Sequence, residues 1–113
     1  MDRVTYYRHI IERILAEHLE YIHKEREIET IAVVDDQSNN FLLLDLGWQP
    51  TRRIHSVIFH LRIKDDKIWI EQDWTEDGVA RDLLRAGVPP DDIILGFQPP
   101  DMRPYAQELL KVA

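Results

Sequence analysis

The sequence predicts a single α+β domain over residues 1–113: an N-terminal helix, a four-stranded antiparallel meander sheet, and helices packed on that sheet as a second layer. Three observations predict this fold. Helical periodicity opens the chain, four apolar or alternating runs follow at short spacing, and a well-bounded helical segment begins after residue 74. Strands joined by short links favour antiparallel pairing, because a parallel pair needs a crossover connection. The length suits one domain with one core.

The first helix is predicted over residues 4–26. Side chains at steps of three and four residues form one stripe along it, which is typical of a helix that buries one face. The stripe comprises Val4, Tyr7, Ile10, Ile11, Ile14, Leu15, His18 and Ile22. No glycine caps the charged run at residues 24–29, so the sequence marks the end of this helix only weakly.

Two strands are predicted next, at residues 30–35 and 41–48, with a polar loop between them. The first is a β-branched run. The second, FLLLDLGW, is apolar nearly throughout, which indicates a strand buried on both faces. Gly47 within it indicates a bulge or a close approach of another backbone segment.

A long hairpin at residues 54–74 is the clearest feature of the sequence. With a two-residue turn at Asp65-Asp66, the numbers of opposite residues sum to 131, and a slip of one residue would mix the two faces. One face pairs Val57, Phe59, Leu61 and Ile63 with Trp74, Gln72, Ile70 and Ile68; the other pairs Lys64 with Lys67, Arg62 with Trp69, His60 with Glu71, and Ile58 with Asp73. Asp-Asp is a weaker turn than Asn-Gly, and a four-residue loop at 64–67 would keep the same faces.

The last third of the chain is predicted to be mostly helical. Thr75 is a good N-cap, and Gly87 followed by Pro89-Pro90 ends the helix that it starts. The apolar run at residues 93–97 is too short to distinguish a strand from a buried turn. A short terminal helix is expected at residues 101–112.

Composition limits the classes of function. The chain has no cysteine, which excludes disulfides and cysteine-based metal or redox sites. The N-terminus lacks the apolar run of a signal peptide or membrane span, so we expect a cytoplasmic protein without membrane contact. The net charge of -7 disfavours direct binding to a nucleic-acid backbone and fits a protein partner. A homo-oligomer is also compatible with the sequence.

No catalytic set is recognised in the sequence. The four glycines are scattered, so no phosphate-binding loop exists, and neither serine lies in a nucleophile motif. The adjacent acidic pairs are typical of turns and caps. Asp45 with Glu71 or Asp73 is a less favoured carboxylate pair; a buried Asp45 bonded to backbone is preferred. We therefore expect a protein that is not an enzyme and uses no cofactor or metal.

The mixed face of the hairpin is the predicted partner-binding surface. Arg62 opposite Trp69 predicts a cation–π contact, and His60 opposite Glu71 predicts a cross-strand ion pair. A basic segment lies just before the hairpin's first strand. The candidate residues are Arg52, Arg53, His55, His60, Arg62, Trp69 and Glu71.

The chain resembles the XisI family, the fdxN element excision controlling factors. The resemblance lies in the helix start V-x-x-Y-R, FLLLDLGW at 41–48, KIWIEQDWTEDGVA at 67–80, the GVPPDDIILGFQPP run at 87–100, and Arg53, His55, His60 and Arg103-Pro104-Tyr105. The chain departs from the family pattern at Asn39-Asn40, Pro90 and Gln98, so a site that uses the family's additional histidines is not expected.

This resemblance implies a cyanobacterial cytoplasmic α+β protein that regulates DNA recombination. Family members are associated with excision of a DNA element during heterocyst differentiation, where a separate recombinase cuts the DNA and XisI acts beside XisH, whose type resembles restriction endonucleases. The leading hypothesis is a regulatory accessory protein with an XisH-type partner. The alternatives are an antitoxin-like inhibitor of a nuclease-fold partner and a direct DNA-binding factor.

Overall fold

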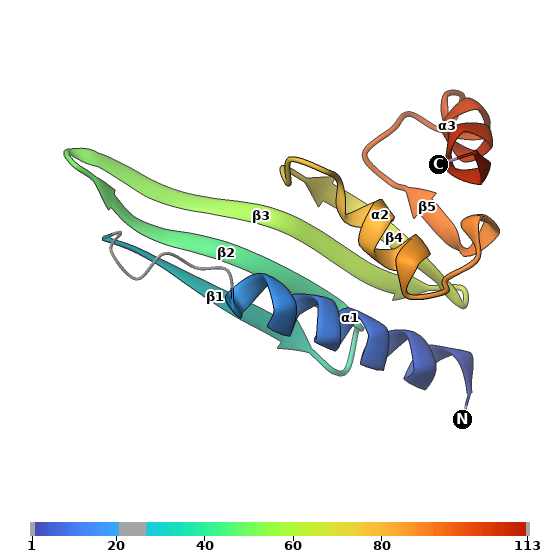
Figure 1. The fold of residues 1–113 in the computed structure, drawn as a ribbon, viewed down its shortest axis with the longest axis horizontal. Coiled ribbons are helices and arrows are strands. Elements are labelled where there is room, and N and C mark those ends of the chain that lie inside the picture. Colours follow the sequence, from blue (N-terminus) through green and yellow to red (C-terminus); the bar gives the residue numbers. More distant parts are fainter. Residues whose placement is uncertain (1, 21–26, 113) are drawn as a thin grey trace.

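The computed structural model describes residues 2–20 and 27–112 and has the predicted α+β architecture (Figure 1). The described residues form one sheet with the strand order β1-β2-β3-β4-β5. The elements are α1 (Arg3–Glu20), β1 (Ile28–Asp35), β2 (Asn40–Gln49), β3 (Arg52–Lys64), β4 (Lys67–Asp73), α2 (Val79–Arg85), the 3₁₀ turn η1 (Pro90–Asp92), β5 (Ile93–Leu95) and α3 (Arg103–Lys111).

The fifth strand corrects the predicted four-stranded meander. Strands β1 to β4 do form an antiparallel meander, but β5 pairs with β4 in parallel, and α2 lies in the connection between them. The three residues of β5 carry no periodicity that could separate a strand from a turn. Only its position beside β4 makes this run a strand, and the sheet is therefore mixed.

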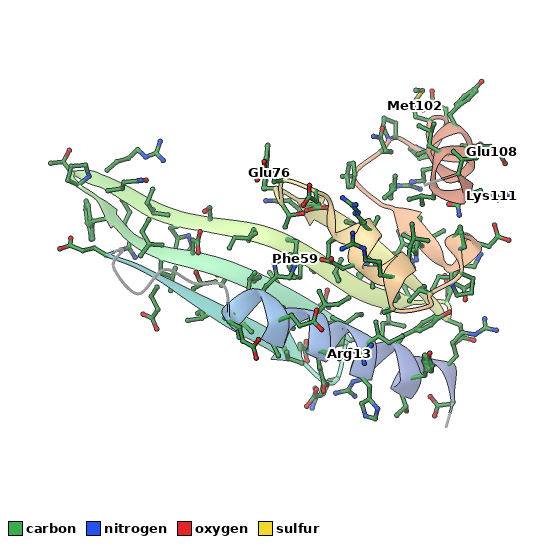
Figure 2. The ribbon with its side chains drawn as sticks, in the orientation of Figure 1. Arg13, Phe59, Glu76, Met102, Glu108 and Lys111 are labelled. Carbon is green, nitrogen blue, oxygen red and sulfur yellow. The ribbon has the colours of Figure 1, made fainter. Side chains whose placement is uncertain are left out.

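The hydrophobic core lies on the face of the sheet that α1 and α2 cover (Figure 1). Phe59 of β3 points toward this helical layer and is 0% exposed (Figure 2). The stripe of α1 supplies Tyr7, Ile10, Ile11, Ile14 and Leu15, as predicted; the strands supply Phe41, Leu43, Phe59, Leu61, Ile63, Ile68, Ile70 and Ile93; α2 and the segment after it supply Val79, Leu83 and Val88. This face of the sheet is called the inner face below.

The hairpin of β3 and β4 turns through Asp65 and Asp66, which have φ values of 55° and 61°. Two consecutive left-handed residues make the tight turn that suits a twisted hairpin, and aspartate tolerates this region. The predicted sum of 131 is confirmed from Lys64 opposite Lys67 to Leu61 opposite Ile70. The two-residue turn therefore sets the register, as the sequence predicted.

Beyond Leu61 the predicted register of this hairpin is wrong by one residue. The pairing shifts, so that His60 lies opposite Gln72 instead of Glu71, and Phe59 lies opposite Asp73 instead of Gln72. A bulge at Glu71 accommodates the extra residue and adds local twist. A second irregularity lies in the β2–β3 pair, where Leu43 is opposite Phe59 but the next residue, Leu44, is opposite Val57. The alternation of side chains in the sequence does not reveal either shift.

Strand β2 is buried on one face only, which corrects the prediction of burial on both. Phe41 and Leu43 are buried against the helices, whereas Leu42, Leu44 and Leu46 are only half-buried on the opposite face. The predicted close backbone approach at Gly47 is confirmed. A Cβ on Gly47 would lie 2.2 Å from the carbonyl oxygen of Glu27, and its φ of +155° is unusual for other residues.

Two helix boundaries differ from the prediction. Helix α1 is described to Glu20, and the predicted continuation to residue 26, with Ile22 and His23, lies outside the described residues. Helix α2 begins at Val79, so Thr75 is not its N-cap. The Asp73 carboxylate instead accepts hydrogen bonds from the backbone N–H of Thr75 at 2.9 Å and of Val79 at 2.7 Å.

The C-terminal end of α2 is built as the sequence predicted. Gly87 has a φ of 98°, its N–H donates to the carbonyl of Leu84, and Val88 N–H donates to the carbonyl of Leu83. This pair of bonds is the Schellman motif, in which glycine adopts the left-handed conformation without a steric penalty. None of the described helices is both long and apolar enough to cross a membrane.

Candidate functional site

The sheet face turned away from α1 and α2 carries the candidate site, and it is called the outer face below. Side chains alternate along each strand, so the partners of the half-buried residues of β2 identify this face on β1 and β3. Its apolar centre comprises Ile31, Val33, Leu42, Leu44, Leu46 and Val57. None of these side chains is buried, and Val33 is 40% exposed. The outer face therefore presents apolar surface that the described residues leave uncovered.

Trp69 anchors a group of charged side chains beside this apolar centre. The guanidinium carbons of Arg62 and Arg103 lie 5.9 and 5.3 Å from the centre of its ring, and the Lys64 Nζ lies at 5.2 Å. Arg62 Nε is 3.5 Å from a carboxylate oxygen of Glu71. We call these five residues the Trp69 cluster. The predicted contact of Arg62 with Trp69 is present, and Glu71 joins it through Arg62 rather than through His60.

Arg103 and Lys64 are the members of the cluster that sequence reasoning missed. Arg103 lies at the start of α3, far from Trp69 in sequence, and its side chain donates to the carbonyls of Gln98 at 3.1 Å and Gly96 at 3.4 Å. Only the position of α3 next to β5 brings it to the ring. Lys64 follows Arg62 at a two-residue step on one strand, and that spacing was a usable signal.

Gly96 provides the space for the Glu71 carboxylate. A Cβ at Gly96 would lie 2.2 Å from Glu71 Oε1 and 3.2 Å from the carbonyl oxygen of Ile70. Any side chain here would therefore push the carboxylate away from Arg62. The segment after β5 thus shapes the cluster in two ways. Its carbonyl oxygens accept hydrogen bonds from the Arg103 side chain, and Gly96 leaves room for the Glu71 carboxylate.

His60 lies at the border between the apolar centre and the Trp69 cluster. Its Nε2 is 2.8 Å from the side-chain oxygen of Asn40, so Nε2–H donates when the ring is neutral. Partial burial lowers the pKa of His60, and the nearby positive charge of Arg62 lowers it further. The negative charge of Glu71 acts in the opposite direction but has a smaller effect than burial. The neutral ring is therefore favoured at pH 7, and the predicted ion pair with Glu71 does not form across the strands.

Arg53 and His55 lie far from the Trp69 cluster. They belong to the part of the β2–β3 hairpin that extends beyond the helices (Figure 1). Arg53 packs over Trp48, with 5.6 Å from its guanidinium carbon to the ring centre, and Trp48 is 50% exposed. Arg53 and Arg62 are nine residue steps apart along β3, which is roughly 30 Å at about 3.3 Å per residue. The predicted residues therefore form two groups instead of one.

Arg52 lies outside both groups. It is opposite Gln49 at the hairpin tip, and the alternation along β3 turns its side chain away from the outer face. His55, opposite Leu46, shares the outer face with Arg53. Of the seven predicted residues, four gather around Trp69 or its border, two lie on the distal part of the same face, and Arg52 lies on the other side.

The chemistry available in the Trp69 cluster is binding of anionic groups. Three cations surround one aromatic ring and face a single carboxylate, so the cluster is positive in a chain of net charge -7. Guanidinium groups pair well with carboxylates and phosphates. Within the described residues, no three His, Asp or Glu side chains lie close enough together to hold a metal ion.

Asp45 does not form the carboxylate pair considered from the sequence. Its Oδ1 accepts a hydrogen bond from the Thr30 hydroxyl across the β1–β2 pair, and the residue is half-buried. Asp45 shares the inner side of β2 with Leu43, whereas Glu71 contacts Arg62 on the outer face. The preferred bond to backbone is also not seen, because a neighbouring side chain supplies the donor.

Comparison with known proteins identifies relatives over nearly the whole chain. The XisI protein family model matches residues 1–108. A solved XisI-like protein from Anabaena variabilis ATCC 29413 superposes with a TM-score of 0.85 at 31% identity, covering 90% of this chain and 94% of that one. A second solved protein from that organism, the fdxN element excision controlling factor XisI, superposes with a TM-score of 0.79 at 34% identity and covers 94% and 96%. Curated proteins give no match. The chain belongs to the XisI family.

Proposed function

We propose that this chain is a cytoplasmic, non-catalytic regulatory protein that acts by binding a protein partner of the XisH type. In this role it would control excision of a DNA element, while a separate recombinase cuts and joins the DNA. Family membership supports the regulatory role, because one relative of known structure is named as an excision controlling factor. The uncovered outer face is the observation that carries the binding role.

The outer face has the composition of a protein interface. Its centre is apolar, and an aromatic residue with arginines lies at its border, which are the residue types that dominate binding energy. The Trp69 cluster would accept acidic side chains of the partner, and Leu42, Leu44 and Val57 would meet its apolar side chains. Arg53 and His55 extend the same face toward the hairpin tip, and Arg52 would contact the partner from the tip itself.

Co-expression with an XisH-type protein tests the proposal. The tagged chain should retain the partner on an affinity column, and Trp69→Ala should weaken the complex by 2 kcal/mol or more, about 30-fold in the dissociation constant. Arg62→Ala and Arg103→Ala should weaken it by smaller factors. Titration calorimetry of the purified pair measures each constant.

Tyr105→Ala is the matched control, because Tyr105 is an aromatic residue that is 69% exposed on α3. It should leave the affinity unchanged, and circular dichroism should show that all variants are folded. Absence of a complex at every salt concentration would overturn the proposed function. A complex that Trp69→Ala and Arg62→Ala leave intact would show that the partner binds elsewhere.

A further inference from the structure

The described residues leave one long edge of the sheet, that of strand β1, open. Strand β1 is the first strand in the sheet order, and it pairs with β2 over eight consecutive residue pairs without a bulge. Within residues 2–20 and 27–112, no segment pairs with its other side. Such an edge presents a row of unpaired N–H and C=O groups to solvent, which is a template for another strand.

Strand β1 lacks three of the features that often protect an edge strand, namely proline, lysine and a bulge, and its two charged residues, Glu29 and Asp35, lie near its ends. Its sequence, IETIAVVD, contains no proline and no lysine, and the pairing with β2 is regular throughout. Its second half is exposed and apolar: Val33 is 40% and Val34 is 41% exposed, and Ala32 is also exposed. At the opposite edge, β5 is only three residues long and lies against α3.

The sequence of β1 is compatible with antiparallel pairing to itself. In a dimer with a two-fold axis perpendicular to the sheet, the outer faces of both copies lie on the same side. Opposite residues must then belong to the same face, and because side chains alternate along the strand, their numbers must have an even sum. A sum of 64 would place Glu29 opposite Asp35, and a sum of 62 would place Glu27 opposite Asp35, which are like-charged pairs. A sum of 66 avoids both.

The register with a sum of 66 also buries the exposed part of the strand. It centres the axis on Val33, which then lies opposite Val33 of the second copy. Ala32 lies opposite Val34, and Ile31 lies opposite Asp35. Five residues of each strand would pair before the chain turns away at Asp36. Two β-branched valines would thus meet at the centre, a favourable cross-strand pair.

We propose that the chain forms a two-fold symmetric homodimer through antiparallel pairing of β1 with β1 of a second copy. The two sheets become one continuous sheet, and the apolar centres of the two outer faces join across the axis. The inference goes beyond the proposed function, because it concerns the sheet edge and requires no other protein.

Cysteine cross-linking tests the dimer and its register, since the chain has no cysteine of its own. In this register, residue 33 faces its own copy with the Cα atoms about 4.5–5.5 Å apart, within the range of a disulfide. Val33→Cys should therefore give a covalent dimer under mild oxidation. Ile31→Cys is the matched control on the same face, because the two copies of residue 31 lie roughly 13 Å apart.

Sedimentation equilibrium of the cysteine-free chain provides the second measurement. The wild type should be a dimer, and Val33→Lys should convert it to a monomer with unchanged circular dichroism. Val112→Lys, at another exposed valine, should leave the dimer intact. A monomeric wild type whose Val33→Cys variant stays uncross-linked would overturn the dimer and leave the edge to a strand of another protein. Cross-linking at Ile31 instead of Val33 would overturn the register.

Discussion

The inner and outer faces of the sheet are formed by the same strands, and on β2 both faces carry leucines, but the two faces are buried to different extents. On β2, Leu43 of the inner face is buried, whereas its neighbour Leu44 on the outer face is half-buried. Helices α1 and α2 cover one face only (Figure 1). Burial of the leucines of β2 therefore depends on the covering helices rather than on the hydrophobicity of the strand.

The largest difference between the faces is expected from truncating one apolar residue on each. Phe59→Ala should lower the free energy of unfolding by about 3–5 kcal/mol, because it removes a fully buried ring and leaves a cavity. Leu44→Ala on the outer face should cost roughly 1 kcal/mol, about half the transfer energy of a buried leucine. Urea denaturation measures both values, and equal losses would contradict the contrast between the faces.

A smaller effect is expected at Tyr7, which ties α1 to the segment before β5. Its hydroxyl donates to the Asp92 carboxylate, and burial together with this bond raises the pKa of Tyr7 to about 12. Tyr7→Phe should lower the free energy of unfolding by about 1–2 kcal/mol at pH 7. The exposed Tyr6, replaced by phenylalanine, is the matched control and should show almost no loss.

The sign of the pH dependence at Tyr7 follows from the raised pKa. Below pH 10, the ordinary value, tyrosine is neutral in both the folded and the unfolded state, and the stabilisation is complete. As the pH rises from 10 through 12, the unfolded state loses its proton first, so the stabilisation is lost. Ultraviolet titration of the wild type should show a tyrosine that ionises near pH 12 and that is missing from Tyr7→Phe, and its absence from the wild type would argue against the bond.

The smallest effect is expected at His60 on the outer face. Burial lowers the pKa of its imidazole, so the folded state resists protonation more than the unfolded state does. The wild type should therefore keep its full stability above pH 6.5 and lose part of it as the pH falls from 6.5 through the lower folded pKa. His60→Gln should remove this part of the pH dependence in urea denaturation series.

His55→Gln is the control for this pH series, because it removes an exposed imidazole from the same strand. If His60→Gln changes the slope between pH 7 and 5 no more than His55→Gln does, the outer face around His60 is as open to solvent as the hairpin tip. That outcome would mean that the outer face is exposed to solvent at both histidines.

Local features of the candidate site were predictable, and its assembly was not. Trp69 and Arg62 follow from the hairpin turn and strand alternation, because both lie within a few residues of Asp65-Asp66. Their contact with Arg103 depends on α3 lying beside β5, which no local pattern records. The one-residue shift at Glu71 also escaped prediction, since a bulge changes register without changing the composition of the strand.

The α+β class, the buried stripe of α1, the turn at Asp65-Asp66 and the end of α2 at Gly87 could all be predicted from the amino-acid sequence. Each of these depends on backbone preferences or periodicity within a few residues, which the sequence carries directly. Three features depend on the folded arrangement: residues 93–95 form a strand, Arg103 joins Trp69, and one face and one edge of the sheet are left uncovered by residues 2–20 and 27–112. Those outcomes depend on contacts between segments distant in sequence, so no single segment encodes them.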